Sequence, residues 1–327
     1  MTMKKCMGCM RDYGETNVKC PVCGYSDEQM RINKETLPEA LEPTTIIGGR
    51  YILGRTLSCS DFSIVYVGWD ALLEKRVAVK EYFPYRLGHR KNGNEISFAS
   101  ANDQVVFEKG MEHFENEIRT LTKHQDIHEI VEVYRCVREN NTSYMIMEYM
   151  AGCTLEDWLE GDVSIEDLSA NDIFGKLLTA IDKIHTRKIG HYNLAPDSVY
   201  LDEEGNVRLL DFGYAKKECL KFMDSRLVLM DGRYSAPEVM LGRRADENAD
   251  LYSLGAICYR MLTGDAPGES IRRLKKKSRF TLRGEGKENE KMINLLAEVL
   301  PEKRPGSIRQ FREITERKGE SPDAGQK

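Results

Sequence analysis

The sequence predicts an α+β protein in which a small β-rich part precedes a larger, mainly helical part. Short runs of β-branched and aromatic residues, which are typical of strands, are concentrated between residues 50 and 150. After residue 150 the apolar residues recur at intervals of three and four, which is the period of an amphipathic helix. Paired cysteines near the N-terminus add a small module in front of both parts.

Composition restricts the class of protein. The chain has 327 residues, of which 41% are hydrophobic and 31% charged, and this balance is that of a globular protein with a sizeable core. A formal net charge of −5 provides no global positive field for nucleic acid or anionic lipid. No stretch reaches the roughly 18 consecutive apolar residues of a membrane span, and residues 1–5 do not lead into an apolar signal core. We therefore expect a cytoplasmic protein with no membrane span.

Four cysteines near the N-terminus form two CxxC pairs, Cys6 with Cys9 and Cys20 with Cys23. Each pair can point two thiolates at one ion, and the ten-residue spacer lets the second pair complete a tetrahedral site. A segment this short has no core of its own and needs a covalent or metal staple. The spacing predicts a four-cysteine zinc ribbon over residues 1–30 with one structural zinc, and a redox CxxC is the alternative.

The rest of the chain divides by composition. Residues 31–49 contain two prolines and a Gly-Gly pair without sustained periodicity, which predicts a linker. The β-rich part covers residues 50–150 and the helical part residues 151–317. Residues 318–327 are polar and contain proline and glycine, which predicts a disordered tail.

Elements are predicted from the same periodicities. The strongest strand patterns lie at residues 64–67, 76–80 and 143–149. The strongest helix patterns lie at residues 112–123, 173–184, 251–262 and 292–300.

A series of short motifs runs through both parts of the chain. In order they are Val77-Ala78-Val79-Lys80, Glu117, Met147-Glu148-Tyr149, His191, Asp211-Phe212-Gly213, Ala236-Pro237-Glu238, Asp250 and Arg304. Together they resemble the eukaryotic-like protein kinase domain, and most nearly the bacterial serine/threonine kinases that open with a zinc ribbon and carry the run found here at Lys80–Pro84. The resemblance implies a two-lobed protein-kinase-like fold, with residues 50–150 as the N-lobe and 151–317 as the C-lobe.

Some of these residues are candidates for holding ATP. Strand alternation puts Ala78 and Lys80 on one face, so that a small residue can lie against a base while the ammonium reaches phosphates. Helix spacing brings Glu117 towards the sheet, where it can pair with Lys80, and the long separation between them implies an inserted segment around Gly88–Asp103. The resemblance adds Glu148, Met150 and Ser198 as nucleotide-binding positions and Asp211 as a Mg²⁺ ligand.

The phosphate-binding loop departs from the family pattern. The family's G-x-G-x-x-G aligns with Ser58–Ser63, in which all three glycines are serines. The added side chains and the negative charge of Asp61 are expected to weaken phosphate binding without abolishing it.

The catalytic loop, His191–Ser198, departs at four positions. Asn193 replaces the aspartate that accepts the substrate proton, and a neutral amide is a very poor base. Ala195 replaces the lysine that neutralises the transferring phosphoryl group. Ser198 replaces the asparagine that binds a second magnesium, and Tyr192 replaces the arginine that pairs with an activation-loop phosphate, so phosphorylation at a site such as Ser225 lacks its usual receptor.

The structural positions are retained, because Glu238 and Arg304 can form the family's buried ion pair and Asp250 can support the catalytic loop. We therefore predict a pseudokinase that binds ATP and Mg²⁺ weakly, through Lys80 and Asp211, and regulates an unknown protein partner by binding. The main alternative is an active, atypical serine/threonine kinase, because phosphoryl transfer relies chiefly on positioning and electrostatics.

Two further features bear on partners. The basic run Arg272–Arg279 is either a solvated helix face or a docking patch for an acidic partner. A zinc-ribbon adaptor for nucleic acid is the third hypothesis, and nucleic acid binding is disfavoured because the ribbon interleaves few basic and aromatic residues. Those residues are Lys4, Lys5, Arg11, Tyr13, Lys19 and Tyr25.

Overall fold

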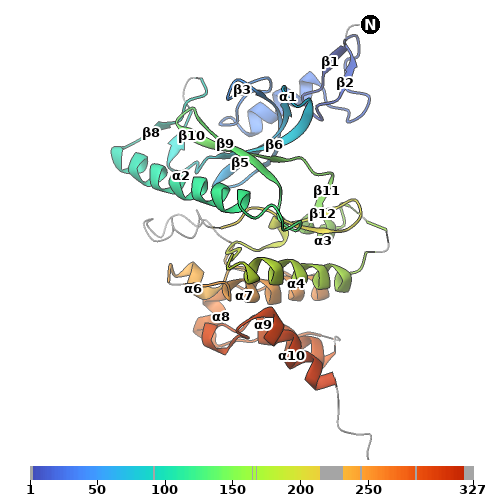
Figure 1. The fold of residues 1–327 in the computed structure, drawn as a ribbon, viewed down its shortest axis with the longest axis vertical. Coiled ribbons are helices and arrows are strands. Elements are labelled where there is room, and N and C mark those ends of the chain that lie inside the picture. Colours follow the sequence, from blue (N-terminus) through green and yellow to red (C-terminus); the bar gives the residue numbers. More distant parts are fainter. Residues whose placement is uncertain are drawn as a thin grey trace, which may run out of the picture. The chain divides into compact units, whose positions relative to one another are not determined.

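The computed structural model describes residues 3–90, 93–163, 165–166, 168–213, 231–243, 245–283 and 286–319. The chain divides into two compact units, the first of Met1–Asp126 with Val131–Met150 and the second of Ile127–Ile130 with Ala151–Lys327. The first unit is rich in strands and the second is mainly helical (Figure 1). The predicted fold class is therefore confirmed.

A cysteine-rich segment opens the first unit. Strands β1 (Met3–Lys5) and β2 (Asp12–Gly14) form a two-stranded antiparallel sheet, and helix α1 (Asp27–Thr36) follows. Residues 31–49, for which the composition predicts a linker, contain instead the end of α1 and strand β3 (Ile46–Ile47). A two-residue strand shows no periodicity in the sequence. It forms because the Gly48–Gly49 turn, with both residues at positive φ, folds it against the next strand.

The main sheet of the first unit has six strands in the order β3-β4-β5-β6-β10-β9, and every neighbouring pair is antiparallel. Its longer members are β4 (Tyr51–Cys59), β5 (Ser63–Asp70), β6 (Lys75–Tyr82), β9 (Val133–Glu139) and β10 (Thr142–Glu148). The three predicted strands are therefore present as β5, β6 and β10, and their ends differ from the predicted ends by no more than three residues.

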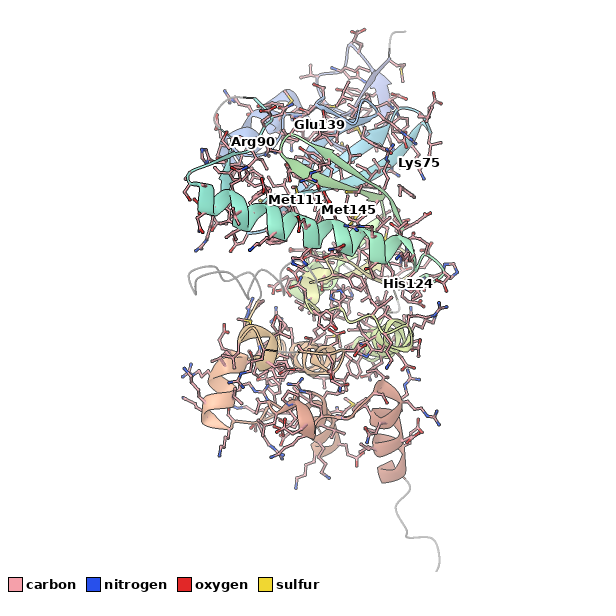
Figure 2. The ribbon with its side chains drawn as sticks, turned by 60° about the vertical axis from the view of Figure 1, so that its left-hand side comes forward. Lys75, Arg90, Met111, His124, Glu139 and Met145 are labelled. Carbon is pink, nitrogen blue, oxygen red and sulfur yellow. The ribbon has the colours of Figure 1, made fainter. Side chains whose placement is uncertain are left out.

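Helix α2 (Ala101–Thr122) packs on this sheet and is longer than predicted. Its N-cap is Ser100, whose side chain accepts a hydrogen bond from the Asp103 N–H. The inserted segment expected at 88–103 forms the short hairpin of β7 (Gly88–His89) and β8 (Ser97–Phe98) and the first turn of this helix. Figure 2 labels Met111 of α2 and Met145 of β10, both buried, where helix and sheet meet.

The second unit contains a three-stranded antiparallel sheet and a stack of helices (Figure 1). The strands are β11 (Gly152–Thr154), β12 (Val199–Asp202) and β13 (Val207–Leu209). The helices are α3 (Leu155–Glu160), α4 (Ala170–Thr186), α6 (Pro237–Met240), α7 (Ala249–Thr263), α8 (Ser270–Lys276), α9 (Lys287–Leu296) and α10 (Ile308–Gly319), with 3₁₀ turns at Pro196–Ser198 and Pro301–Lys303.

Helix α7 is the centre of the second unit. Its first ten residues are all buried, so it packs against neighbours on every side rather than along one stripe. At Gly255 a Cβ atom would lie 2.7 Å from the Cβ of Ala297 and 2.9 Å from the Ile293 oxygen, so glycine permits the close approach of α9. Helix α9 ends at Leu296 rather than at the predicted residue 300.

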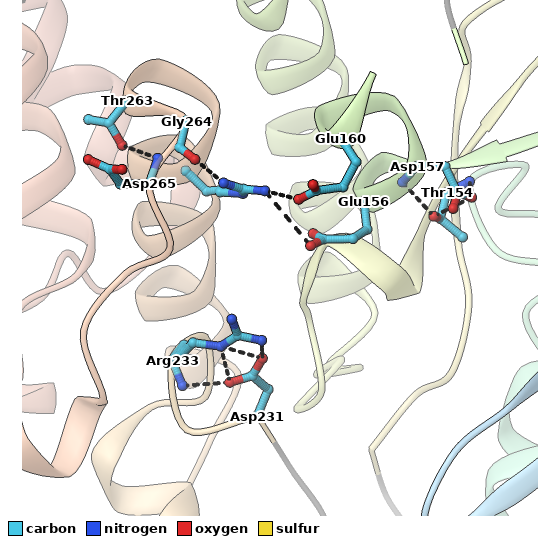
Figure 3. A network of polar contacts seen from close by, with 10 residues as sticks. Thr154, Glu156, Asp157, Glu160, Asp231, Arg233, Thr263, Gly264 and Asp265 are labelled. Atoms are coloured by element: carbon cyan, nitrogen blue, oxygen red, sulfur yellow. Dashed lines mark hydrogen bonds and ion pairs between the residues drawn. The ribbon is translucent and has the colours of Figure 1, made fainter. Parts of the chain in front are cut away.

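A polar network joins α7 to α3 within the second unit (Figure 3). Arg260 of α7 donates to the Gly264 carbonyl and to Glu160 of α3, and lies 4.0 Å from Glu156. The arginine therefore neutralises acidic groups on α3 and also caps the C-terminus of its own helix.

No helix among the described residues is long and apolar enough to cross a membrane. The predicted tail lies outside the described residues from residue 320 onwards, and so does Ser225.

Candidate functional site

Lys80 and Glu117 come together within the first unit. Lys80 lies on β6 and Glu117 on α2, and the Lys80 Nζ is 3.9 Å from the Glu117 Oε1. Both side chains are buried, with 7% and 2% of their surfaces exposed. The Lys80 ammonium also lies 5.6 Å from the ring centroid of Phe114, one helical turn before Glu117. The ion pair expected from the motif order is therefore present.

The other nucleotide-binding candidates of the first unit, Ala78, Glu148 and Met150, differ in burial and in the contacts they make. Ala78 is buried and pairs with Met147 of β10 and Val67 of β5. The Glu148 carboxylate accepts a hydrogen bond of 2.7 Å from the Glu132 N–H, so it supports the pairing of β10 with the chain before β9. Met150 is half-buried just beyond β10.

The serine loop, Ser58–Ser63, closes on itself. The Ser60 Oγ accepts hydrogen bonds from the backbone N–H of Phe62 at 3.3 Å and of Ser63 at 3.1 Å. In addition, the Ser60 N–H donates to the Ser63 oxygen at 2.9 Å. Phe62 is buried with its ring edge-on to Tyr82, at a centroid distance of 4.9 Å. A side-chain hydroxyl therefore takes the backbone donors that a glycine loop offers to phosphate.

Asn193 and Asp211 meet in the second unit. The Asn193 Nδ2 donates to the Asp211 Oδ2 at 2.9 Å and to the Asp211 backbone oxygen at 3.1 Å. Asp211 has a φ of 56°, a left-handed conformation that is uncommon outside glycine and often found at functional sites. The residue at the base position thus supplies a hydrogen-bond donor to the predicted magnesium ligand, where the family has a second carboxylate.

The Ser198 hydroxyl is directed at the backbone of its own loop. It accepts from the Ala195 N–H at 2.9 Å and lies 3.1 Å from the Asn193 oxygen and 2.9 Å from the Ala195 oxygen. Ser198 is 1% exposed. A hydroxyl held this way is a poor metal ligand, and so these residues do not fit the two-metal arrangement of the family.

Asp250 supports the catalytic loop from below. It is fully buried and accepts hydrogen bonds of 2.7 Å from the backbone N–H groups of both His191 and Tyr192. His185 contacts the same carboxylate at 2.8 Å through its Nε2. Burial acts to raise the pKa of Asp250, but hydrogen bonding and charge from His185, together with His191, outweigh it and hold the pKa below its ordinary value.

Glu238 and Arg304 form the buried ion pair that the motif order predicts. The Arg304 guanidinium donates to both carboxylate oxygens, at 2.6 and 3.0 Å. It also donates to the Glu298 oxygen, so this pair joins α6 to the loop after α9.

Comparisons with known proteins identify the family to which this chain belongs. Residues 61–311 match the family described as the protein kinase domain, over more than half of the chain. The chain belongs to the protein kinase domain family. Its relatives include the serine/threonine-protein kinase PrkC of Bacillus subtilis (strain 168), 28% identical over 227 residues, which are 68% of this chain and 32% of PrkC. The probable serine/threonine-protein kinase PknB of Bifidobacterium longum (strain NCC 2705) is 29% identical over 238 residues, 69% of this chain and 32% of that protein.

A solved structure agrees with the family. The structure titled PpkA-294 apo form superposes with a TM-score of 0.74 at 25% sequence identity, covering 85% of this chain and 99% of that one. The kinase-domain chain spans only about a third of the curated relatives it matches. The predicted resemblance to bacterial serine/threonine kinases is confirmed at the level of the family and its fold.

The four N-terminal cysteines of this kinase-domain protein cluster as predicted. Their four sulfur atoms all lie within 4.8 Å of one another, with Cys6 and Cys23 at 3.6 Å and Cys9 and Cys20 at 3.8 Å. A tetrahedral zinc with Zn–S bonds of about 2.3 Å requires sulfur atoms roughly 3.8 Å apart. Burial raises the pKa of Cys6 to about 12 and also raises the pKa of Cys9, whereas at Cys20 the backbone N–H groups of Cys23 and Val22 outweigh burial and lower the pKa to about 7. The donor set fits zinc.

The predicted basic docking patch needs a correction at Arg273. This residue is 6% exposed, and its guanidinium donates to the Tyr252 hydroxyl at 2.8 Å and the Ala297 oxygen at 3.2 Å. It also stacks 3.7 Å from the centroid of Phe280. Helical geometry turns Arg273 inwards, while Arg272 beside it is exposed. Arg279 lines a surface hollow of about 880 Å³ that carries equal numbers of acidic and basic side chains, so that hollow does not select for an acidic partner.

A buried polar network around Glu81 was not predicted from the sequence. Glu81, next to Lys80, is fully buried and pairs with Arg90, and the Tyr66 hydroxyl donates to it at 2.9 Å. Burial raises the pKa of Glu81. Figure 2 labels Arg90, whose backbone N–H also donates to Glu39 at 2.6 Å. The only sequence signal is an acidic residue at a strand position that alternation assigns to the interior.

Proposed function

We propose that this kinase-domain protein is a pseudokinase that regulates a protein partner by binding rather than by phosphorylating it. The observation that carries the proposal is the contact between Asn193 and Asp211. An amide nitrogen that donates to the Asp211 carboxylate cannot accept a substrate proton at the same position. It also competes with a metal ion for that oxygen.

Two further observations support the loss of phosphoryl transfer. Ser198 directs its hydroxyl to the loop backbone, and Ala195 has no charge to offer a transferring phosphoryl group. Residues that act as a unit in catalysis lose activity together, so three altered positions in one loop leave little for the others to contribute.

ATP binding is proposed to be weak and dependent on magnesium. The buried Lys80–Glu117 pair provides a cation for phosphates, and Asp211 provides one carboxylate for a metal. Two features are expected to weaken phosphate binding. The Ser60 hydroxyl already accepts the backbone N–H groups of the loop, and Asp61 adds a negative charge. The proposed nucleotide contacts are Ala78, Glu148, Met150 and Ser198. We propose the cytoplasm as the compartment of this protein.

One structural zinc per chain is proposed at Cys6, Cys9, Cys20 and Cys23. The four sulfur atoms lie within 4.8 Å of one another, and two of their separations, 3.6 and 3.8 Å, are close to that of a tetrahedral zinc site, which supports it. Metal analysis of purified protein is expected to find one zinc per chain, and a Cys20→Ser, Cys23→Ser variant is expected to lose it. Protein without stoichiometric zinc, or a variant that keeps all of it, contradicts the assignment.

Transfer of radiolabelled phosphate tests the central proposal. The wild-type protein is incubated with labelled ATP, Mg²⁺ and a generic basic protein, and the Asp211→Ala variant is the blank that reveals a contaminating kinase. Transfer no greater than the blank is expected. Robust wild-type transfer that the variant lacks would overturn the pseudokinase proposal and favour the active, atypical serine/threonine kinase, for which the intact Lys80–Glu117 pair is the supporting observation.

Nucleotide binding is tested separately by thermal stabilisation, because a ligand that binds the folded state raises its stability. A small rise with millimolar ATP and Mg²⁺, absent without Mg²⁺ and absent in Asp211→Ala, is expected. A large rise that survives Asp211→Ala contradicts the metal-bridged mode of binding.

A further inference from the structure

The cysteine-rich segment docks directly on strand β4 of the kinase sheet. The backbone N–H of Arg55 donates to the Met7 oxygen at 2.7 Å, and the Arg55 Nε donates to the Gly8 oxygen at 3.0 Å. Met7 and Gly8 are the two residues between Cys6 and Cys9. The docking oxygens therefore belong to the same short loop that carries two of the four proposed zinc ligands.

Close packing accompanies these hydrogen bonds. At Gly54 a Cβ atom would lie 2.3 Å from the Met7 oxygen and 2.4 Å from the Met10 Cε, so only glycine admits the cysteine loop this near to β4. Met10 is 1% exposed and has a φ of 58°. A further contact involves β5, the strand next to β4. The ammonium of Lys5 on β1 lies 3.5 Å from the ring centroid of Trp69 on β5.

The docking point coincides with an irregularity in β4. The pairing of β4 with β5 shifts register between Leu53 and Thr56 and again between Thr56 and Ser58. Arg55 lies within this bulge, and its N–H bonds to the cysteine loop. A bulge persists when its unpaired backbone groups find another partner, and a register slip of one residue would turn the following side chains to the opposite face.

We infer that zinc binding by the four cysteines holds the bulge of β4 and, through it, the conformation of the serine loop, Ser58–Ser63. The inference rests on the proposed zinc site and goes beyond it. The zinc ligands Cys6 and Cys9 fix the Met7 and Gly8 oxygens, which hold Arg55. The strand then runs directly into the loop that carries the Ser60 turn. Loss of zinc frees the cysteine loop, because the segment has no core of its own.

Hydrogen exchange of the full-length chain under reducing conditions tests the inference. Removing zinc with a strong chelator is expected to lower the protection of the Arg55 amide about tenfold or more, and to increase exchange across residues 51–64. Residues 249–263, in the centre of the second unit, serve as the internal reference and are expected to keep their protection.

Two glycine variants separate docking from general damage to the sheet. Gly54→Ala places a methyl group against the cysteine loop, whereas Gly68→Ala places one among the Val77 and Val79 side chains of the same sheet. With zinc present, Gly54→Ala is expected to show the exchange pattern of the metal-free wild type, and Gly68→Ala is not. Because coupling is reciprocal, competition with a chromogenic chelator is expected to show weaker zinc binding in Gly54→Ala and unchanged binding in Gly68→Ala.

A second pair of substitutions, expected to disturb the fold less, tests the same inference in case Gly54→Ala does not fold. Arg55→Met removes the side-chain donor to the Gly8 oxygen and keeps a side chain of similar length, and Arg135→Met makes the same change at an exposed position of β9. Weaker zinc binding in Arg55→Met alone supports the inference. If purified protein holds no zinc, the proposed metal site is wrong. If zinc is present and its removal leaves the Arg55 amide and residues 51–64 unchanged, the metal site stands and the inference is overturned.

Discussion

Asp250, which anchors the catalytic loop, differs from two residues of the loop itself, Asn193 and Ser198, in what its side chain binds. The Asp250 carboxylate accepts hydrogen bonds from two backbone N–H groups of the loop and contacts His185, all within 2.8 Å. In the loop itself, Asn193 and Ser198 hydrogen bond to neighbouring protein groups rather than presenting a base or a metal ligand. The buried contacts that hold the kinase fold are therefore present, whereas Asn193 and Ser198 are bonded to neighbouring groups, and the pseudokinase proposal rests on this contrast.

The first unit repeats the contrast. The Lys80–Glu117 pair is buried and intact, whereas the Ser60 hydroxyl occupies the donors of the phosphate loop. A buried ion pair resists change because removing one partner leaves the other charge uncompensated. An exposed turn carries no such penalty, so its chemistry can change while the fold persists.

The largest expected effect comes from breaking the support. Asp250→Ala is expected to destabilise the protein by about 3–5 kcal/mol, because it leaves two buried N–H groups and His185 without their acceptor. Urea unfolding followed by circular dichroism measures the change. Asp162→Ala, an exposed aspartate of the same unit, is the control. A loss below about 1 kcal/mol would contradict the structural role of Asp250.

A smaller effect is expected within the basic run. Arg273→Ala is expected to cost about 2–3 kcal/mol, since it removes two buried hydrogen bonds and the stack on Phe280. Arg272→Ala, one residue earlier and exposed, is expected to change stability by less than about 0.5 kcal/mol. Equal effects of the two substitutions would show that Arg273 belongs to the surface patch after all.

Restoring the phosphate loop is expected to have a modest effect on binding. Ser60→Gly releases the N–H groups of Phe62 and Ser63, and is expected to tighten Mg²⁺-ATP binding about three- to tenfold. Titration calorimetry measures the affinity, and Ser97→Gly, which changes an exposed serine of β8 outside the loop, is the control. An unchanged affinity in Ser60→Gly would mean that the hydroxyl does not compete with phosphate.

The smallest effect is expected from repairing the base alone. A general base contributes about 10²–10⁴ in rate where its partners are in place. Asn193→Asp is therefore expected to give little transfer, because Ala195 and Ser198 stay unrepaired and such residues act as a unit. The combined Asn193→Asp, Ala195→Lys, Ser198→Asn variant is the fairer rescue. Substantial labelled-phosphate transfer by Asn193→Asp alone would show that the rest of the machinery is intact.

Much of the fold and part of the site follow from the sequence. The order of motifs from Lys80 to Arg304 predicts the fold, and the strand and helix periodicities place most elements. The paired cysteines predict their own cluster because CxxC spacing is local. The short strand β3 and the first turns of α2 were missed because Ile46–Ile47 is too short for a period and residues 101–111 mix polar and apolar side chains.

The chemical groups that this protein possesses can be read from its amino-acid sequence alone. An amide stands at Asn193 where a base would be a carboxylate, Ala195 carries no charge, and four thiols have the spacing of a single metal site. The partner of each group becomes known only from the folded chain. The Asn193 amide donates to Asp211, Arg273 stacks on Phe280, and Met7 bonds to Arg55. The physical reason is that a side chain's donors and charge are fixed by its identity, whereas hydrogen bonding and burial depend on residues that the chain brings together from distant positions.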